Sequence, residues 1–322
     1  MSKIILTGAT GFIGTNFLIY LMQKTEYEIL CLGNSRGLQV KEEYFHEYDA
    51  KRISFAKANL YDLETAKEFI RNADHVIHMA GRVGNAATVN DLALYVDDIL
   101  LTANVASAAS ENGIKKMLYC SSSTGYKNAE YPIKEEEYFQ SQPAYSGYGE
   151  MRRYIERLLE HLCEHSDLEI IIARAGAVYG CYDNFDLATC HYVPALIKKY
   201  FDKSSDTLKV WGQGKEERDL MFAEDFVAGC MIVFEKGKSI EPINVATGYT
   251  ISISDVINTI AAVAIEKGIK KKKLVFQPEK PVAIPYRCLS TAKLKSLGFG
   301  NSHDLRSGIK KTIEWYIENQ FH

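Results

Sequence analysis

The feature that most constrains the fold is a set of spaced glycines near the N-terminus. A short apolar stretch, Lys3 to Leu6, leads into Gly8-x-x-Gly11-x-x-Gly14, and an amphipathic stretch from Gly11 to Gln23 follows. Such glycines allow a tight strand-to-helix turn, close approach of backbone to a ligand, and close packing of helix on strand. Free N–H groups at a helix start favour phosphate. The pattern predicts a dinucleotide site made by Gly8, Thr10, Gly11, Phe12, Ile13 and Gly14.

Short β-branched runs alternate with longer amphipathic stretches in the first half of the chain, as in parallel strands joined by crossover helices. The predicted strands are Lys3 to Leu6, Glu28 to Leu32, Ile53 to Lys57, His75 to Met79, Lys116 to Cys120 and Glu169 to Arg174. We predict an α/β fold with a Rossmann-type doubly wound parallel sheet over residues 1–175. Residues that follow the third and fourth strands complete the predicted cofactor site: Asn59, Leu60, Met79, Ala80 and Gly81.

After about residue 175 the alternation stops, and Pro and Gly divide the chain into shorter segments. Two helices are still predicted there, Ser254 to Lys267 and Leu305 to Asn319. We expect residues 176–322 to form mainly a smaller C-terminal α/β lobe that binds substrate, with some segments returning to the Rossmann sheet.

The composition argues against several classes of partner. The net charge is −3 and the pI about 6.3, so no basic field attracts nucleic acid or an anionic membrane. No apolar run approaches a membrane span, and no signal-peptide pattern precedes the first strand. The 7 cysteines are scattered, without zinc-ligand spacing. We expect reduced thiols, a cytoplasmic location, and no nucleic-acid, membrane or metal site.

The end of the second strand bears on the choice of cofactor. An acidic residue there usually binds the ribose 2′-hydroxyl of NAD, whereas a neutral residue with a nearby Arg accommodates the 2′-phosphate of NADP. Here the strand is followed by Gly33, Asn34, Ser35 and Arg36, without a carboxylate. Ser35 and Arg36 therefore favour NADP(H). NAD(H) is the alternative if Arg36 is only a solvated loop charge.

Further motifs lie along nearly the whole chain. They include the segments His75 to Gly81, Ser121 to Ser123, Val178 to Gly180, Val210 to Gly214 and Asn244 to Gly248, and a helix start at Tyr148. With the Gly-x-x-Gly-x-x-Gly spacing, they resemble the extended short-chain dehydrogenase/reductase family and its NAD-dependent epimerase/dehydratase members. Segments similar to the GDP-fucose synthase-like nucleotide-sugar reductases and epimerases are Asp183 to Phe185, His191 to Ile197 and Trp211 to Arg218.

The resemblance implies catalytic roles for Tyr148, Arg152, Ser123 and His191. Family members use a Tyr as proton donor or acceptor, and a Lys one helical turn later stabilises the phenolate. The matching pair here is Tyr148 and Arg152, which would also contact the cofactor; Arg keeps the charge on a bulkier planar group. Ser123 best fits the position of the family's Ser or Thr hydroxyl residue. Its sequence neighbours Ser122 and Thr124 are the alternatives. His191 fits a family acid from the second lobe.

Two family elements are missing. Thr124 and Gly125 stand where dehydratases have an Asp-Glu pair, so 4,6-dehydration is not expected. The Cys that serves epimerisation aligns with Thr124, although Cys181 could approach the sugar from another side. We expect NADP(H)-dependent reduction of a 4-keto (6-deoxy) nucleotide sugar, with GDP as a candidate nucleotide. The alternatives are an NAD-dependent nucleotide-sugar epimerase, alone or combined with reduction, and a non-catalytic cofactor-binding protein.

The resemblance also implies that a nucleotide-diphosphate sugar binds the second lobe. A diphosphate needs cations, and a nucleotide needs an aromatic or apolar slot. Arg218 matches a diphosphate-contacting Arg of the family. The other predicted substrate contacts are Ser123, Thr124, Asn184, His191, Lys198, Trp211 and Arg287.

Two predicted helices, Asp97 to Asn112 and Gly149 to His165, suggest a homodimer, because family members commonly pair through two such helices into a four-helix bundle. Their apolar faces are Leu100, Leu101, Asn104, Val105 and Ala108 on the first, and Ile155, Leu158, Leu159 and Leu162 on the second. Burial inside one subunit would give the same pattern.

Overall fold

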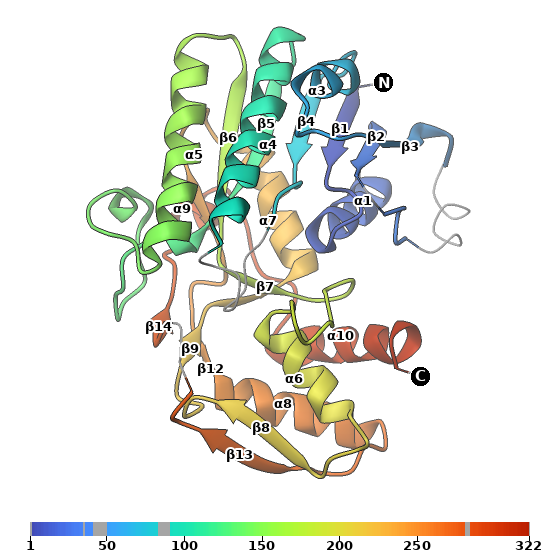
Figure 1. Cartoon of the computed structure of the whole chain (residues 1–322), viewed down its shortest axis with the longest axis vertical. Helices are drawn as coiled ribbons and strands as arrows, with labels where there is room; N and C mark the ends of the chain where they lie inside the picture. Colours follow the sequence, from blue (N-terminus) through green and yellow to red (C-terminus); the bar gives the residue numbers. More distant parts are fainter. Residues whose placement is uncertain (1, 35, 41–49, 83–90, 281–283, 322) are drawn as a thin grey trace.

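A computed structural model describes residues 2–34, 36–40, 50–82, 91–280 and 284–321. Its centre is a seven-stranded sheet in the order β11-β6-β5-β4-β1-β2-β3 (Figure 1). The strands are β1 (Lys3–Thr7), β2 (Glu28–Gly33), β3 (Ile53–Lys57), β4 (His75–His78), β5 (Lys116–Ser122), β6 (Glu169–Ala175) and β11 (Ile243–Val245). All neighbours run parallel. The predicted Rossmann-type α/β fold is confirmed.

Helices cover both faces of the sheet, because successive strand residues point to opposite sides. On one face Ile4 and Leu6 of β1 pack with α1 (Phe12–Lys24) and α7 (Ala223–Lys236). On the other face Ile5 joins a second core with α3 (Leu63–Phe69), α4 (Leu92–Glu111) and α5 (Ser146–Glu164). Helix α4 begins earlier than predicted, since the Asp91 carboxylate accepts a hydrogen bond from the Ala93 N–H at 3.0 Å and caps the helix there.

Helix α4 is long and apolar enough to cross a membrane, and among the described residues it is the sole helix with that character. It packs between α3 and α5 in this structure. Most of the residues predicted to mediate self-association are buried inside the subunit: Leu101, Asn104, Val105, Ala108, Ile155 and Leu159. Packing against the sheet therefore explains much of the apolar pattern of both helices.

The smaller lobe lies below the main sheet in Figure 1. Its core lies between helices α6 (Tyr192–Phe201), α8 (Ile253–Glu266) and α10 (Leu305–Asn319) and the parallel strands β8 (Thr207–Trp211) and β13 (Lys273–Gln277). The bounds predicted from the sequence for α8 and α10 differ from the observed bounds by at most one residue at each end.

Short strands lie between the main sheet and this core. The pair β7 (Ala177–Tyr179) and β10 (Leu220–Phe222) runs parallel, and β9 (Glu217–Arg218) lies between β12 (Ile251–Ser252) and β14 (Tyr286–Arg287). A short helix, α9 (Ala292–Ser296), packs near β11. The chain thus returns to the main sheet after residue 176, through α7 and β11, and brings β9 and β14 toward the carboxyl ends of its strands.

Candidate active site

The predicted dinucleotide site forms a pocket at the carboxyl ends of β1, β2 and β4. Eight of the predicted cofactor residues line it: Gly8, Thr10, Gly11, Arg36, Leu60, Met79, Ala80 and Gly81. The first turn of α1 holds three more of the predicted residues, Phe12, Ile13 and Gly14. The side-chain oxygen of Asn59 accepts a hydrogen bond from the Tyr61 N–H at 3.4 Å. The structure therefore brings most of these residues to one cavity.

Two glycines are required by close backbone contacts around this pocket. Gly8 has φ +68°, and a Cβ atom there would lie 2.5 Å from the Ala80 nitrogen. A Cβ on Gly14 would lie 2.0 Å from the Gly8 carbonyl oxygen. A side chain at either position would push β1, β4 and α1 apart. The cradle they leave at the start of α1, whose N-cap Gly11 brings no side chain to the N–H groups, fits a dinucleotide pyrophosphate.

The other end of the pocket is lined by Gly33, Asn34 and Arg36. Arg36 is exposed, and no carboxylate is found among the described residues that line the cavity. A Cβ on Gly33 would lie 2.6 Å from the Thr10 side chain, so this position has no room for an acidic side chain without a shift. Ser35 lies outside the described residues.

Tyr148 and Arg152 lie one turn apart on α5, as the spacing predicted, and both are buried. The Arg152 Nη2 donates to the Tyr148 hydroxyl at 2.7 Å, and Nη1 donates to the Tyr119 hydroxyl at 3.2 Å. Burial by itself lowers the pKa of Arg152, but Asp98 and the two tyrosine oxygens raise it well above its usual range. A cation is therefore held directly on the phenolic oxygen of Tyr148.

The hydroxyl residues predicted after β5 form a 3₁₀ turn, η2 (Ser123–Gly125). Ser122 caps this turn: its Oγ accepts from the Thr124 N–H at 3.2 Å and the Thr124 hydroxyl at 3.0 Å. Ser123 is half-buried and makes no side-chain hydrogen bond to the described residues. Of the three neighbouring hydroxyls, that of Ser123 is therefore the one not used by the turn itself.

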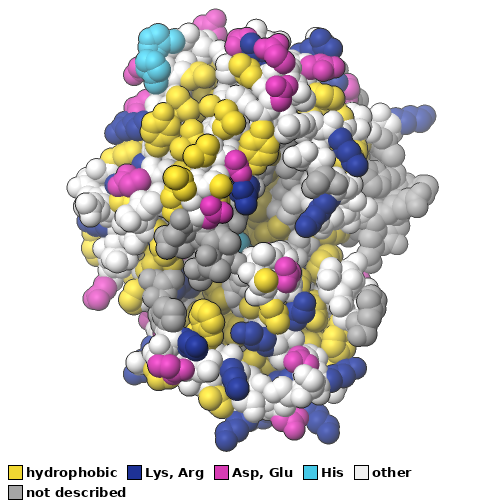
Figure 2. All heavy atoms as spheres, viewed as in Figure 1, with side chains coloured by type: hydrophobic (Ala, Val, Ile, Leu, Met, Phe, Trp, Pro, Cys, Tyr) yellow, Lys and Arg dark blue, Asp and Glu magenta, His cyan; other side chains and the backbone are white. Residues whose placement is uncertain are grey.

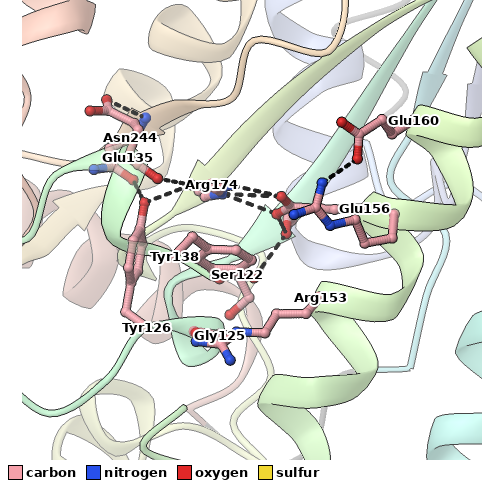
Figure 3. A network of polar contacts seen from close by, with 12 residues as sticks. Ser122, Gly125, Tyr126, Glu135, Tyr138, Arg153, Glu156, Glu160, Arg174 and Asn244 are labelled. Atoms are coloured by element: carbon pink, nitrogen blue, oxygen red, sulfur yellow. Dashed lines mark hydrogen bonds and ion pairs between the residues drawn. The ribbon is translucent and has the colours of Figure 1, made fainter. Parts of the chain in front are cut away.

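A buried polar network holds this turn against α5 (Figure 3). Arg153 donates to the Gly125 carbonyl oxygen at 2.8 Å, and the Tyr138 hydroxyl donates to the Ser122 carbonyl oxygen at 3.0 Å. Behind them the Glu156 carboxylate accepts from Arg174 Nη2 at 2.7 Å, and the Arg174 guanidinium lies 3.7 Å from the centre of the Tyr138 ring. The network joins α5, which carries Tyr148, to the turn that carries Ser123.

Arg218 and Arg287 lie side by side on the paired strands β9 and β14, and Arg287 contacts the loop after η2. Arg218 Nη1 donates to the Glu217 carbonyl oxygen at 2.9 Å, and Arg287 Nη1 donates to the Lys127 carbonyl oxygen at 2.8 Å. Neither forms an ion pair with a described carboxylate. Burial and the Arg218 charge lower the pKa of Arg287 to about 10, and burial lowers that of Arg218. Two adjacent cations that form no ion pair with a described carboxylate suit a ligand diphosphate.

The other predicted substrate residues are more dispersed. His191 occupies the N-cap position of α6 without a capping hydrogen bond from its side chain. The residue is exposed, although desolvation by the protein around its ring lowers its pKa. Asn184 Nδ2 donates to the Thr189 hydroxyl at 2.8 Å, within its own loop. Lys198 lies in the last turn of α6, and Trp211 ends β8 with 52% of its surface exposed. No hydrogen bond or ion pair among described residues joins these four to Arg218.

One group of metal-ligating side chains comes together in the described part of the chain: His161, Glu164 and His165. All three are exposed at the far end of α5, about 20 Å along the helix from Tyr148. This group is therefore separate from the candidate active site.

Comparison with known proteins assigns the chain to a family. The sequence profile of the NAD dependent epimerase/dehydratase family matches residues 4–246. The chain belongs to this family. The glycine turn, Tyr148 and Arg218 of this epimerase/dehydratase family member all lie within the matched region. The resemblance inferred from the motifs is therefore confirmed.

Full-length relatives of this epimerase/dehydratase family member include GDP-L-colitose synthase of Yersinia pseudotuberculosis, 27% identical and covering 99% of both chains. The dTDP-4-dehydro-6-deoxy-D-allose reductase of a Streptomyces species is 25% identical, covering 97% of this chain and 95% of the relative. The solved UDP-N-acetylglucosamine 4-epimerase of Methanobrevibacter ruminantium has the same fold, with a TM-score of 0.85, 22% identity and 99% coverage of both chains.

Proposed function

We propose that this protein is an NADP(H)-dependent reductase that converts the ketone of a 4-keto (6-deoxy) nucleotide sugar to an alcohol. The observation that carries the proposal is the buried Tyr148–Arg152 contact, which combines a proton donor with a fixed cation. Ketone reduction needs both a hydride source and a proton donor. The relative named dTDP-4-dehydro-6-deoxy-D-allose reductase supports this substrate class.

The glycine turn and Thr10 would hold the pyrophosphate, and Met79, Ala80 and Gly81 would contact the rest of the dinucleotide. When bound, the nicotinamide cofactor supplies a hydride. Arg36, with no carboxylate beside it in the described lining, supports NADP(H) over NAD(H).

Tyr148 would donate its hydroxyl proton to the sugar oxygen as that oxygen becomes an alkoxide. The Arg152 guanidinium stabilises the phenolate that remains, because it already contacts the same oxygen. Ser123 would hydrogen-bond the sugar oxygen and fix its distance from Tyr148. His191 would act only if the sugar is also epimerised.

Arg218 and Arg287 would bind the diphosphate of the substrate, because neither forms an ion pair with a described carboxylate. Five further residues remain proposed contacts to the nucleotide and the sugar: Trp211, Asn184, Lys198, Thr124 and His191. In this arrangement residues 1–175 mainly hold the cofactor, and residues 176–322 mainly hold the nucleotide sugar.

We also propose a homodimer. Its interface would use the same two helices as predicted, but mostly other residues of them. Leu92, Val96 and Leu100 lie one turn apart along α4 and are 70%, 55% and 44% exposed, and Tyr154 on α5 is 56% exposed. Figure 2 shows apolar side chains gathered on this side of the molecule. A second copy would cover them. All 7 cysteines are unpaired, which supports the proposed cytoplasmic location.

The test is a spectrophotometric assay of NADPH oxidation with 4-keto-6-deoxy sugars carrying GDP or dTDP. We expect turnover with one of them, preference for NADPH over NADH, and a loss of about 100-fold or more in Tyr148→Phe. The matched control is Tyr154→Phe on the exposed side of the same helix. Absence of NADPH oxidation with every such sugar would overturn the proposal. Tightly bound NAD released only on denaturation would instead indicate an epimerase.

A further inference from the structure

A buried carboxylate on α4 contacts the cation of the candidate site. Asp98 is 1% exposed, and its Oδ2 lies 2.9 Å from Nη1 of Arg152. Its other oxygen, Oδ1, accepts a hydrogen bond from the Arg82 backbone N–H at 3.0 Å. One side chain therefore connects the cation beside Tyr148 with the chain segment that follows β4.

Asp98 also reaches the edge of the dinucleotide pocket. A Cβ atom on Gly81 would lie 2.8 Å from Asp98 Oδ1, and Gly81 lines that pocket. The absence of a side chain at Gly81 leaves room for the carboxylate. The contacts run without a break from the pocket wall through Asp98 and Arg152 to the Tyr148 hydroxyl.

The guanidinium of Arg152 is planar, so a single contact to Tyr148 leaves its plane free to rotate. Asp98 and the Tyr119 hydroxyl engage Nη1, while Nη2 is directed to Tyr148 at 2.7 Å. Nη1 is thereby held by side chains on α4 and β5, and Nη2 contacts a side chain on α5.

Asp98 also changes the charge that Tyr148 experiences. With both groups ionised, Arg152 and Asp98 form a pair with no net charge, so the pair stabilises a Tyr148 phenolate less than Arg152 alone would. Three other titratable groups beside Arg152 are neutral near pH 7. Burial lowers the pKa of the His78 ring on β4 to about 3, and it raises the pKa of the Tyr119 hydroxyl and of the Cys120 thiol on β5.

We infer that Asp98 is a positioning residue for proton transfer: it fixes the guanidinium of Arg152 on Tyr148 and limits the positive charge acting on the phenolic oxygen. This role rests on the proposed function of Tyr148 as proton donor. The carboxylate compensates a buried cation that two tyrosine hydroxyls alone would leave without a counter-ion.

The test replaces Asp98 by Asn, which keeps an oxygen for the Arg82 N–H and removes the charge. Arg152 then acts on Tyr148 uncompensated, so a Tyr148 phenolate forms more readily. We expect the high-pH limb of kcat/KM for ketone reduction to move down by about one pH unit or more. NADPH affinity should stay within a few-fold of the wild type. The matched control is Asp97→Asn, which removes the adjacent carboxylate, an exposed partner of Arg82.

A second readout needs no turnover. Protein labelled at the Cζ carbon of tyrosine gives a Tyr148 resonance that is identified by its loss in Tyr148→Phe, and its titration midpoint should fall in Asp98→Asn but not in Asp97→Asn. Asp98→Glu, which keeps the charge, should restore the wild-type midpoint. If Asp98→Asn does not fold, as judged by circular dichroism, Asp98→Ser removes the same charge.

An unchanged Tyr148 midpoint in the neutral variants, or an equal change in Asp97→Asn, would overturn the inference. Failure of the wild type to reduce any keto sugar would refute the proposed function instead, because the resonance measurement would still report on Asp98.

Discussion

Arg218 is the side chain through which the substrate proposal is most directly tested. It is partly buried, forms no ion pair with a described carboxylate, and lies beside Arg287 on the paired strand. Removing it takes away a charged hydrogen bond to the diphosphate worth about 1.5–3 kcal/mol. We expect Arg218→Ala to raise KM for the nucleotide sugar by at least about tenfold, with NADPH affinity unchanged.

Steady-state kinetics and NADPH fluorescence measure these two quantities. Arg306→Ala is the control, because Arg306 pairs with Glu266 on an exposed surface. An unchanged KM in Arg218→Ala would remove this residue from the substrate site.

Asp183 gives the stability of the protein a specific pH dependence. Burial raises the pKa of its carboxyl to about 7, and Oδ2 has no hydrogen-bond partner among the described residues. The folded state therefore holds this proton more tightly than the unfolded state. Its stabilising contribution is complete below about pH 4 and is lost as the pH rises toward 7, by at most about 4 kcal/mol.

Asp183→Asn should remove this dependence and stabilise the protein at pH 8 more than at pH 4. Denaturant unfolding at the two pH values measures the difference. Asp167→Asn, at an exposed position, is the control. If the variant and the wild type lose stability equally between pH 4 and pH 8, Asp183 is not the responsible group.

At the scale of elements, α5 is fixed to the sheet by the Glu156–Arg174 ion pair. Both side chains are at most 3% exposed, and Arg174 also donates to the Glu135 carbonyl oxygen at 2.7 Å. Breaking a buried pair leaves an uncompensated charge and costs about 3–5 kcal/mol. We expect Glu156→Gln to lower the free energy of unfolding by that amount and to reduce kcat, because α5 carries Tyr148.

The control on the same helix is Glu160→Gln. Glu160 pairs with Arg157, and both are exposed, so the change should cost no more than about 1 kcal/mol. Equal losses in the two variants, measured by urea unfolding, would show that the buried pair does not fix α5.

For the whole molecule, the exposed apolar residues of α4 and α5 predict association of two copies. Leu100→Asp places a charge in the proposed interface, and we expect it to shift the protein from dimer to monomer in light scattering coupled to size exclusion. Leu187→Asp, at a position 50% exposed in the other lobe, should leave the mass unchanged. A wild-type protein that is monomeric at micromolar concentration would contradict the homodimer.

The sequence by itself determined the features that depend on local pattern. It predicted the glycine turn, the first six strands of the sheet, the Tyr148–Arg152 spacing on one helix, and the helices α8 and α10. These features could be predicted because glycine conformation and the periodicity of apolar residues are local properties. The same patterns identified the family, which the match over residues 4–246 confirmed.

Only the tertiary structure decided which distant residues meet. In the sequence, Asp98 is only a polar residue in an apolar helix, and its partner Arg152 is far along the chain. The packing of α4 against α5 brings Asp98 Oδ2 to 2.9 Å from Arg152 Nη1. In the same way, β11 completes the sheet from a segment after residue 176, and Leu101 and Val105 are buried although their pattern also fits a dimer face. Periodicity shows that a face is apolar, but what covers that face depends on contacts between segments remote in sequence.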